Sequence, residues 1–214
     1  MTTITLAIIV LTCIVSITAF SREKILDDLI FYPPAITHQH QWYRFITCGF
    51  IHADIMHLAF NMYSFYMFGD AIEFWFSRTF GDKGKILFLV LYISALIVCL
   101  LPTYLQQKNN YYYKSLGASG AVSAIVFAYI FLAPTTKLAL MFLPIPMPAF
   151  LFGAIYLGVT YYLANRGDSH INHSAHFWGA IYGIVFVIVT SYFLSSFNAI
   201  ENFTSEVSFY FHAR

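Results

Sequence analysis

The hydrophobic positions of this chain gather into six long apolar stretches that are separated by shorter polar segments. A helix needs about 20 apolar residues to cross the hydrocarbon core of a bilayer, and each stretch comes near that length. We therefore predict an all-α membrane protein with a single domain over residues 1–214. The expected spans are residues 4–20, 56–76, 85–105, 116–132, 148–163 and 175–194.

The composition agrees with this pattern. Hydrophobic residues make up 59% of the chain and charged residues only 10%, and the mean hydropathy is +0.69, which is unlike a soluble domain. A net charge of +1 without a basic run gives no surface for nucleic acid. The three cysteines, Cys13, Cys48 and Cys99, lack CxxC spacing, so we predict neither a disulfide framework nor a thiolate metal site.

The segment between the first two stretches, residues 21–54, is too long for a tight turn and too aromatic for a solvated linker. We predict a loop at headgroup level, with Trp42, Tyr43 and Phe50 as anchors. Positive charges are densest in the short loop over residues 78–85. This cluster favours a cytoplasmic position for that loop, and with six spans both chain ends would then be cytoplasmic.

Polar residues at membrane depth are informative because hydrocarbon penalises them unless they face water or a polar partner. His52, His57 and Asn61 stand at or near the start of the second span, Ser119 at the start of the fourth, and His176 at the start of the sixth. His57 and Asn61 are one helical turn apart and share a face. Three different spans therefore carry polar side chains near one end.

Small residues indicate which spans pack together. Gly179 and Gly183 form a small-xxx-small ridge on the sixth span, and Gly120 and Ala124 repeat that spacing on the fourth. Such ridges let helix backbones approach closely in a membrane. Packing of these two spans would bring Ser119 and His176 together.

These residue types permit acyl transfer. A serine hydroxyl becomes a useful nucleophile when an imidazole takes its proton and later protonates the leaving amine, and Ser119 and His176 supply that pair. The backbone N–H of Ser119 and the side chains of His57 and Asn61 would donate hydrogen bonds to the oxyanion. Hydrolysis would also need a water-filled pocket, and it requires no metal or other cofactor.

The motifs "HADIMHLAFNM", "GASGA" and "AHFWGAIYG", in this order on the second, fourth and sixth spans, resemble those of the rhomboid intramembrane serine proteases. "WYRFIT" before the first motif and Glu73 in "GDAIE" also match. The resemblance implies a rhomboid-like bundle of six transmembrane helices with a membrane-embedded first loop. It also implies a Ser119–His176 dyad and an oxyanion hole of His57, Asn61 and the Ser119 amide.

Further expectations come from the same resemblance. Substrates would be transmembrane-helix proteins, cut near the outer boundary of the membrane at small residues. The fifth span and the loop over residues 165–174 would form a lateral gate. A six-helix chain of this kind would sit in a bacterial inner membrane. The supporting residues would be His52 as a polar neighbour, Gly117 and Gly120 in the turn that opens the fourth helix, Arg44 in the first loop and Glu73 on the second helix.

One position departs from the family pattern. Many rhomboid relatives have an aromatic residue one helical turn after the nucleophile, where its ring supports the catalytic histidine, but here that position is Ser123. Phe177 or Trp178 is a candidate for this support. Asp54 and Asp168 are read as solvated loop carboxylates rather than as a third catalytic residue.

Two other functions are compatible with parts of the sequence. A non-catalytic rhomboid-like protein would bind transmembrane helices without cutting them. A membrane metal enzyme is suggested by the number of histidines, but adjacent histidine pairs and HxxxH spacing are missing. Replacement of Ser119 would inactivate only a protease. The histidines in question are His38, His40, His52, His57, His170, His173 and His176.

Overall fold

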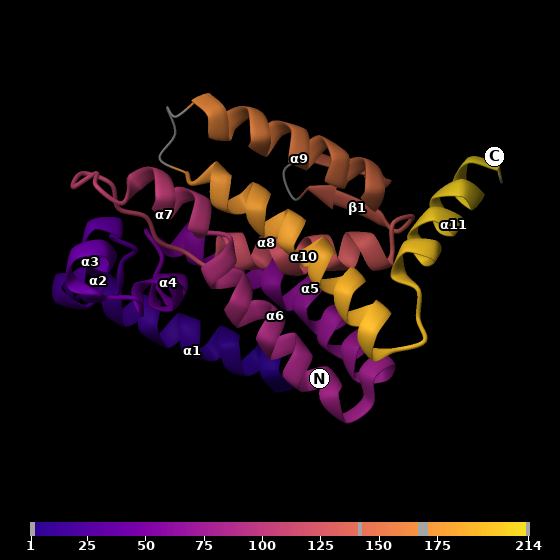
Figure 1. Cartoon of the computed structure of the whole chain (residues 1–214), viewed down its shortest axis with the longest axis horizontal. Helices are drawn as coiled ribbons and strands as arrows, with labels where there is room; N and C mark the ends of the chain where they lie inside the picture. Colours follow the sequence, from indigo (N-terminus) through magenta and orange to yellow (C-terminus); the bar gives the residue numbers. More distant parts are fainter. Residues whose placement is uncertain (1–2, 141–142, 167–170, 213–214) are drawn as a thin grey trace.

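The protein is a bundle of long helices that lie side by side along its longest axis in the computed structural model, which describes residues 3–140, 143–166 and 171–212 (Figure 1). α1 begins and α10 ends toward the same end of the bundle. The predicted all-α fold is confirmed. The long helices are α1 (Thr3–Phe20), α5 (Ile55–Phe80), α6 (Gly84–Val98), α8 (Ser119–Leu132), α9 (Ala149–Arg166) and α10 (His173–Leu194).

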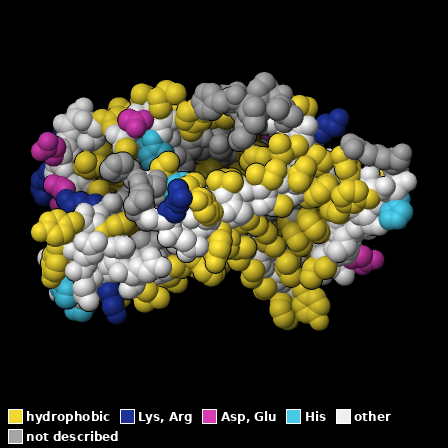
Figure 2. Space-filling model, turned by 90° about the horizontal axis from the view of Figure 1, so that it is seen from above, with side chains coloured by type: hydrophobic (Ala, Val, Ile, Leu, Met, Phe, Trp, Pro, Cys, Tyr) yellow, Lys and Arg dark blue, Asp and Glu magenta, His cyan; other side chains and the backbone are white. Residues whose placement is uncertain are grey.

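The outer surface is that of a multi-pass membrane protein. Within the described residues, the helical stretches Thr3–Phe20, Ile55–Gln107 and His173–Leu194 are long and apolar enough to cross a bilayer, and α8 is a shorter apolar helix. Hydrophobic side chains cover much of the visible face, and charged ones lie mainly toward the two ends of the long axis (Figure 2). Ile86, for example, is 65% exposed. Lipid is the environment in which such side chains are stable.

The third predicted span, residues 85–105, is wrong as a continuous helix. α6 ends at Val98, and α7 (Leu101–Gln107) begins after a break. Pro102 lies at the start of α7. Since proline has no N–H to donate to the preceding turn, the helix is interrupted there.

The fourth predicted span is too long at its start. Residues 116–118 are not helical, and α8 begins at Ser119. The second span is longer than predicted, because α5 continues to Phe80. The first, fifth and sixth predicted spans lie within the observed helices to within one residue.

Several elements were not predicted. The first loop contains short helices, and the connection from α8 to α9 is an antiparallel hairpin in which Lys137 pairs with Pro148. A further helix follows α10 and packs at the end of α8, where Asn202 Nδ2 donates to the Leu132 carbonyl at 3.0 Å and the rings of Phe131 and Phe203 stack (Figure 1). These elements are α2 (Glu23–Leu29), α3 (Pro33–Gln39), α4 (Arg44–Thr47), η1 (Cys48–Phe50), η2 (Gly81–Lys83), β1 (Lys137–Leu140), β2 (Leu143–Pro148) and α11 (Ala199–His212).

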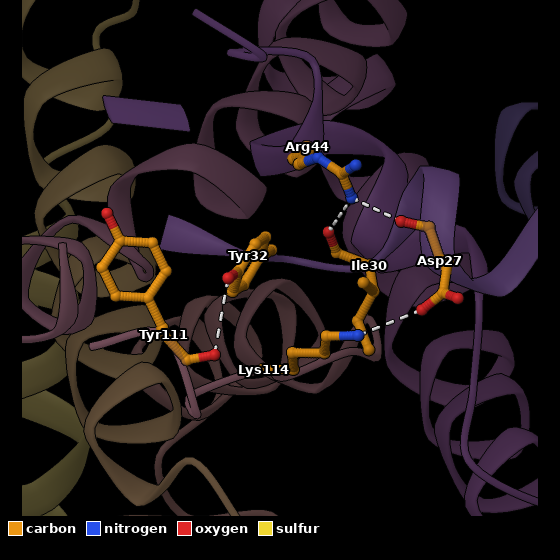
Figure 3. A network of polar contacts seen from close by, with 6 residues as sticks. All are labelled: Asp27, Ile30, Tyr32, Arg44, Tyr111 and Lys114. Carbon is orange, nitrogen blue, oxygen red and sulfur yellow. Dashed lines mark hydrogen bonds and ion pairs between the residues drawn. The ribbon is translucent and has the colours of Figure 1, made fainter. Parts of the chain in front are cut away.

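Arg44 holds the first loop together (Figure 3). Its side chain is buried, and Nη1 donates hydrogen bonds of 2.7 Å to the carbonyl oxygens of Asp27 and Ile30. Lys114, in the connection before α8, forms an ion pair of 3.1 Å with the Asp27 carboxylate. The guanidinium therefore satisfies backbone carbonyls that have no helical partner, and the loop is tied to the segment that leads into α8.

Glu73 joins α5 to the start of α1. Its fully buried carboxylate accepts hydrogen bonds from the backbone N–H groups of Ile4 and Thr5 and from the Thr5 hydroxyl, at 2.8 to 3.1 Å. The first N–H groups of a helix lack partners within that helix, and the helix dipole favours a negative charge there. The structural role expected for Glu73 thus has a physical basis.

α8 and α10 make a very close backbone contact. A Cβ atom at Gly179 would lie 2.0 Å from the carbonyl oxygen of Gly120, and one at Gly183 would lie 2.0 Å from that of Ala124. The small-xxx-small spacing predicts contact between these four residues. The contact leaves no space for a methyl group at either glycine.

We expect Gly183→Ala to lower the free energy of unfolding by about 1–3 kcal/mol, because backbone atoms of α8 occupy the space that the methyl group needs. Denaturant titration in detergent micelles would measure this change. Gly158→Ala on α9 is the matched control, since no heavy atom lies within 4 Å of its added Cβ. Equal effects of the two substitutions would contradict the steric explanation.

Candidate functional site

Ser119 and His176 meet at the start of α8 and α10. Ser119 is the first residue of α8, and His176 lies in the first turn of α10. The Ser119 Oγ and His176 Nε2 atoms are 2.7 Å apart, within a hydrogen bond. The contact predicted from the glycine spacing is therefore present.

The segment before Ser119 is held by the first loop. Phe31 and Ser115 exchange backbone hydrogen bonds of 3.0 and 3.1 Å, and the Gly117 N–H donates to the Cys48 carbonyl at 2.9 Å. Gly117 has a φ of 110°, a conformation that favours glycine. These bonds keep residues 115–118 out of the helix and fix the point at which α8 starts.

α8 is too short to cross a bilayer by itself. With 14 residues, the helix is about 21 Å long, whereas the hydrocarbon core is about 30 Å thick. This length agrees with a helix start below the surface that the first loop covers.

His57 lies against the turn at Gly117. A Cβ atom on Gly117 would be 2.7 Å from His57 Cε1 and 2.9 Å from Nε2. The Ala53 N–H donates a long hydrogen bond of 3.5 Å to Nδ1, so the ring carries its proton on Nε2. Asp54 accepts the His57 N–H at 2.8 Å and caps α5, which gives this exposed carboxylate a structural role.

Asn61 follows His57 by one helical turn and borders the cavity beside Ser119 and His176. Its Nδ2 donates one hydrogen bond of 2.9 Å to the His57 carbonyl, which leaves the second N–H of the amide for another acceptor. Asn61, Ser119 and His176 line a common cavity of about 350 Å³. An oxyanion formed at Ser119 would therefore have side-chain donors close by.

His52 connects α1 to Ala118, the residue before Ser119. The Ala118 N–H donates to His52 Nε2 at 3.5 Å, so the proton of this buried ring is on Nδ1. Nδ1 lies 2.9 Å from the Ser16 hydroxyl, which in turn donates to the Phe50 carbonyl at 2.9 Å. The His52 and His57 rings pack edge to face at 4.9 Å between centroids.

Ser16 was missed by the sequence analysis, although a signal was present. Thr5, Thr12 and Ser16 are polar residues of the first span, and all three are buried. Their spacing of seven and four residues places them on one face of a helix. A polar stripe of this kind indicates the face that contacts other polar groups.

The ring support of His176 differs from the expectation. The ring of His176 packs against that of His173 at 6.0 Å, whereas Phe177 contacts Tyr161 and Trp178. Ser123, at the position where an aromatic was expected, instead shares a hydrogen bond of 2.9 Å with the Tyr156 hydroxyl of α9. Tyr156 was not singled out from the sequence.

The remaining candidates concern the gate and metal binding. Residues 167–170 lie outside the described residues, so the predicted gate loop is described only in part and neither Asp168 nor His170 is placed.

Within the described chain, no three His, Cys, Asp or Glu side chains gather closely enough to hold a metal ion. Cys48 and Cys99 are buried free thiols.

Comparison with protein families identifies one domain. The model described as "Rhomboid domain" matches residues 39–193. This range contains the residues that form the site, with the exception of Ser16 and Phe31 from the N-terminal part.

Individual relatives agree with that match. The chain is 34% identical to RHOMBOID-like protein 12, mitochondrial, of Arabidopsis thaliana over 149 residues, which are 63% of this chain and 42% of the relative. It is 31% identical to the human presenilin-associated rhomboid-like protein, mitochondrial, over 142 residues, 64% of this chain and 35% of the relative. It is 33% identical to the putative rhomboid protease YdcA of Bacillus subtilis over 92 residues, 43% of this chain and 42% of the relative. The matched part thus spans less than half the length of these relatives.

We predict opposite tautomers for the two histidines of the first motif: a proton on Nδ1 in His52 and on Nε2 in His57. Nitrogen-15 NMR of histidine-labelled protein in micelles distinguishes these forms. Ser16→Ala should remove the partner of His52 Nδ1 and lower the free energy of unfolding by about 1–3 kcal/mol.

Thr18→Ala is the control on the same helix, because the Thr18 side chain is exposed and its hydroxyl donates to the Ile14 carbonyl within α1. Its effect should be small. Finding the proton on Nε2 of His52 would contradict the hydrogen-bond arrangement described for Ser16 and Ala118.

Proposed function

The chain belongs to the rhomboid family, and on that premise we propose that it is an intramembrane serine protease with Ser119 as nucleophile and His176 as general base and acid. The observation that carries the proposal is the 2.7 Å contact between Ser119 Oγ and His176 Nε2. An imidazole at this distance can take the hydroxyl proton as the oxygen attacks a carbonyl carbon.

The first step forms a tetrahedral intermediate. The Ser119 oxygen bonds to the carbonyl carbon of the substrate while its proton moves to His176 Nε2. Ser119 is the first helical residue, so its backbone N–H has no acceptor within α8. This N–H, the Nε2–H of His57 and the free N–H of Asn61 would stabilise the negative oxygen.

The second half of the reaction regenerates the serine. His176 gives its proton to the leaving amine, the C–N bond breaks, and an acyl-enzyme results. Water then attacks the ester carbon and transfers a proton to His176, which returns it to Ser119 as the acid product leaves. Every proton transfer in this sequence uses the same ring nitrogen.

The substrates we propose are transmembrane-helix proteins. The dyad lies at the start of a short helix within the bundle, so a soluble polypeptide would have to leave water to reach it. A segment that already resides in the bilayer reaches this depth without that transfer. The apolar outer surface of the protein agrees with such an encounter in the lipid phase.

The identity of the membrane is a separate question. The bacterial inner membrane is the expectation drawn from the sequence, but the Arabidopsis and human relatives are named as mitochondrial proteins. The comparisons therefore do not support a bacterial assignment over a mitochondrial one. The proposed chemistry is the same in either membrane.

We expect Ser119→Ala and His176→Ala to abolish both labelling by a fluorophosphonate probe and cleavage of a model transmembrane substrate. Loss of the general base alone removes about 10²- to 10⁴-fold in rate. Ser205→Ala on α11 is the matched control, since the exposed Ser205 hydroxyl donates to the Asn202 carbonyl of its own helix and does not line this cavity. A chelator should have no effect.

Retention of substrate binding without labelling or cleavage in the native protein would favour the non-catalytic alternative. Sensitivity to the chelator together with indifference to Ser119→Ala would favour the metal-enzyme alternative. Either result overturns the serine protease proposal.

We further expect Asn61→Ala to lower kcat by about 10²- to 10³-fold with little change in KM, because its donor would act on the oxyanion and not on the ground-state carbonyl. Steady-state kinetics with the same substrate would measure both constants. A rise in KM at constant kcat would show that Asn61 binds substrate rather than the transition state.

A further inference from the structure

A cavity of about 350 Å³ opens beside the dyad, bounded by α5, α8, α9, α10 and β1. Ser119, His176 and Asn61 border it, as do Leu138 and Ala139 of β1. The space is therefore continuous with the proposed reaction centre. A substrate bound at Ser119 would have one side chain next to it.

The walls of this cavity are apolar. They consist mainly of aromatic and branched side chains, and the lining includes Phe60, Phe68, Val122, Val126, Phe127 and Phe152. These side chains suit the hydrocarbon surface of a ligand.

Besides Ser119, the hydroxyl-bearing residues Tyr63, Ser64, Ser123 and Tyr156 border the cavity, and the hydroxyls of Ser123 and Tyr156 are paired with each other. Ser123 Oγ and the Tyr156 hydroxyl are 2.9 Å apart, within a hydrogen bond. Because these two hydroxyls are partners of each other, an apolar side chain beside them leaves neither of them unsatisfied. The Tyr156 ring also packs against Phe127, with 5.3 Å between centroids, which holds it as a wall.

The size of the cavity depends on Ser123. This residue follows Ser119 by one helical turn, so its side chain lies on the same face of α8. A serine occupies little of the space there, whereas an aromatic side chain would extend into it. A dry apolar cavity of about 150 Å³ already accommodates benzene, so 350 Å³ is ample for one large side chain.

We propose that this cavity binds a large apolar side chain of the substrate, such as leucine or phenylalanine, adjacent to the cleaved bond, and that Ser123 determines this specificity. The proposal rests on the proposed proteolytic function. It departs from the preference for small residues at the cut that the family resemblance implies. Tyr156 forms the opposite wall and would limit the depth available to the substrate.

The test uses model transmembrane substrates that are identical except for one residue next to the cleaved bond, either alanine or phenylalanine. The native protein should cleave the phenylalanine substrate with a kcat/KM at least about 10-fold higher, since even one methylene in an apolar pocket is worth about 10- to 200-fold. Ser123→Phe should lower this ratio at least 10-fold by filling the cavity. Ser123→Ala leaves the space open and should preserve the ratio.

Two further variants keep the test decisive. Ser123→Val fills less of the cavity and should lower the ratio by a smaller factor. This variant tests the proposal if Ser123→Phe fails to fold. Val159→Phe adds an aromatic ring to α9 at a position that is 50% exposed, away from the cavity, and should not alter the ratio. Fluorophosphonate labelling of each variant shows whether Ser119 is intact and reactive.

The two proposals fail in different ways. A native protein that labels at Ser119 but prefers the alanine substrate overturns the specificity proposal alone. An unchanged ratio in a labelled Ser123→Phe variant does the same. A native protein that neither labels nor cleaves either substrate overturns the proposed function, and the specificity proposal with it.

Discussion

The close approach of α8 and α10 is the contact on which the rest of the site depends. Gly179 and Gly183 sit against the backbone carbonyls of Gly120 and Ala124, at distances that exclude any side chain. In a bilayer, no hydrophobic force draws helices together, so van der Waals packing of this kind supplies much of the association energy. Ser119 directly precedes Gly120 on α8, and His176 precedes Gly179 by less than one turn on α10. The packing that joins the helices therefore also sets the distance between the hydroxyl and the imidazole, and the bundle cannot loosen there without separating them.

The first loop imposes the second constraint, because it determines where α8 begins. An unbroken helix would carry Ser119 in its interior, with its N–H bonded to a carbonyl one turn earlier. The loop prevents this by pairing Phe31 with Ser115 and by accepting the Gly117 N–H at the Cys48 carbonyl. Such a loop would itself expose unsatisfied carbonyls, but Arg44 donates to those of Asp27 and Ile30. By stabilising this loop, the buried Arg44 helps to keep the Ser119 N–H without an acceptor inside α8.

The sequence was informative where one residue type has one physical use. Glycines four residues apart within apolar helices have little purpose other than close packing, and they correctly predicted the pairing of α8 with α10. Pro102 would have predicted the break between α6 and α7 had it outweighed the continuous hydrophobicity around it. The hairpin from Lys137 to Pro148 could not be predicted from "KLALMFLPIPMP", because Pro144, Pro146 and Pro148 disfavour a helix but also lack the N–H groups that a strand ladder uses. Contacts such as Ser16 with His52 and Ser123 with Tyr156 join residues 33 or more positions apart. No local pattern specifies such pairs, because they depend on how whole helices are placed.

Ser123 shows how one position can affect two properties in opposite directions. Without a large ring at this position, His176 is oriented by its hydrogen bond to Ser119, by its contact with His173 and by the backbone of α10. The edge contact between two imidazoles is weaker support than an aromatic ring stacked beside His176 would give. The same small side chain leaves apolar volume next to Ser119 and His176. In the proposed protease, a substrate side chain bound there would contribute binding energy, and an enzyme can use such energy to position the scissile bond. Weak support of the proposed base and an open neighbouring cavity would then be compatible, because the bound side chain would supply some of the order that the missing ring does not.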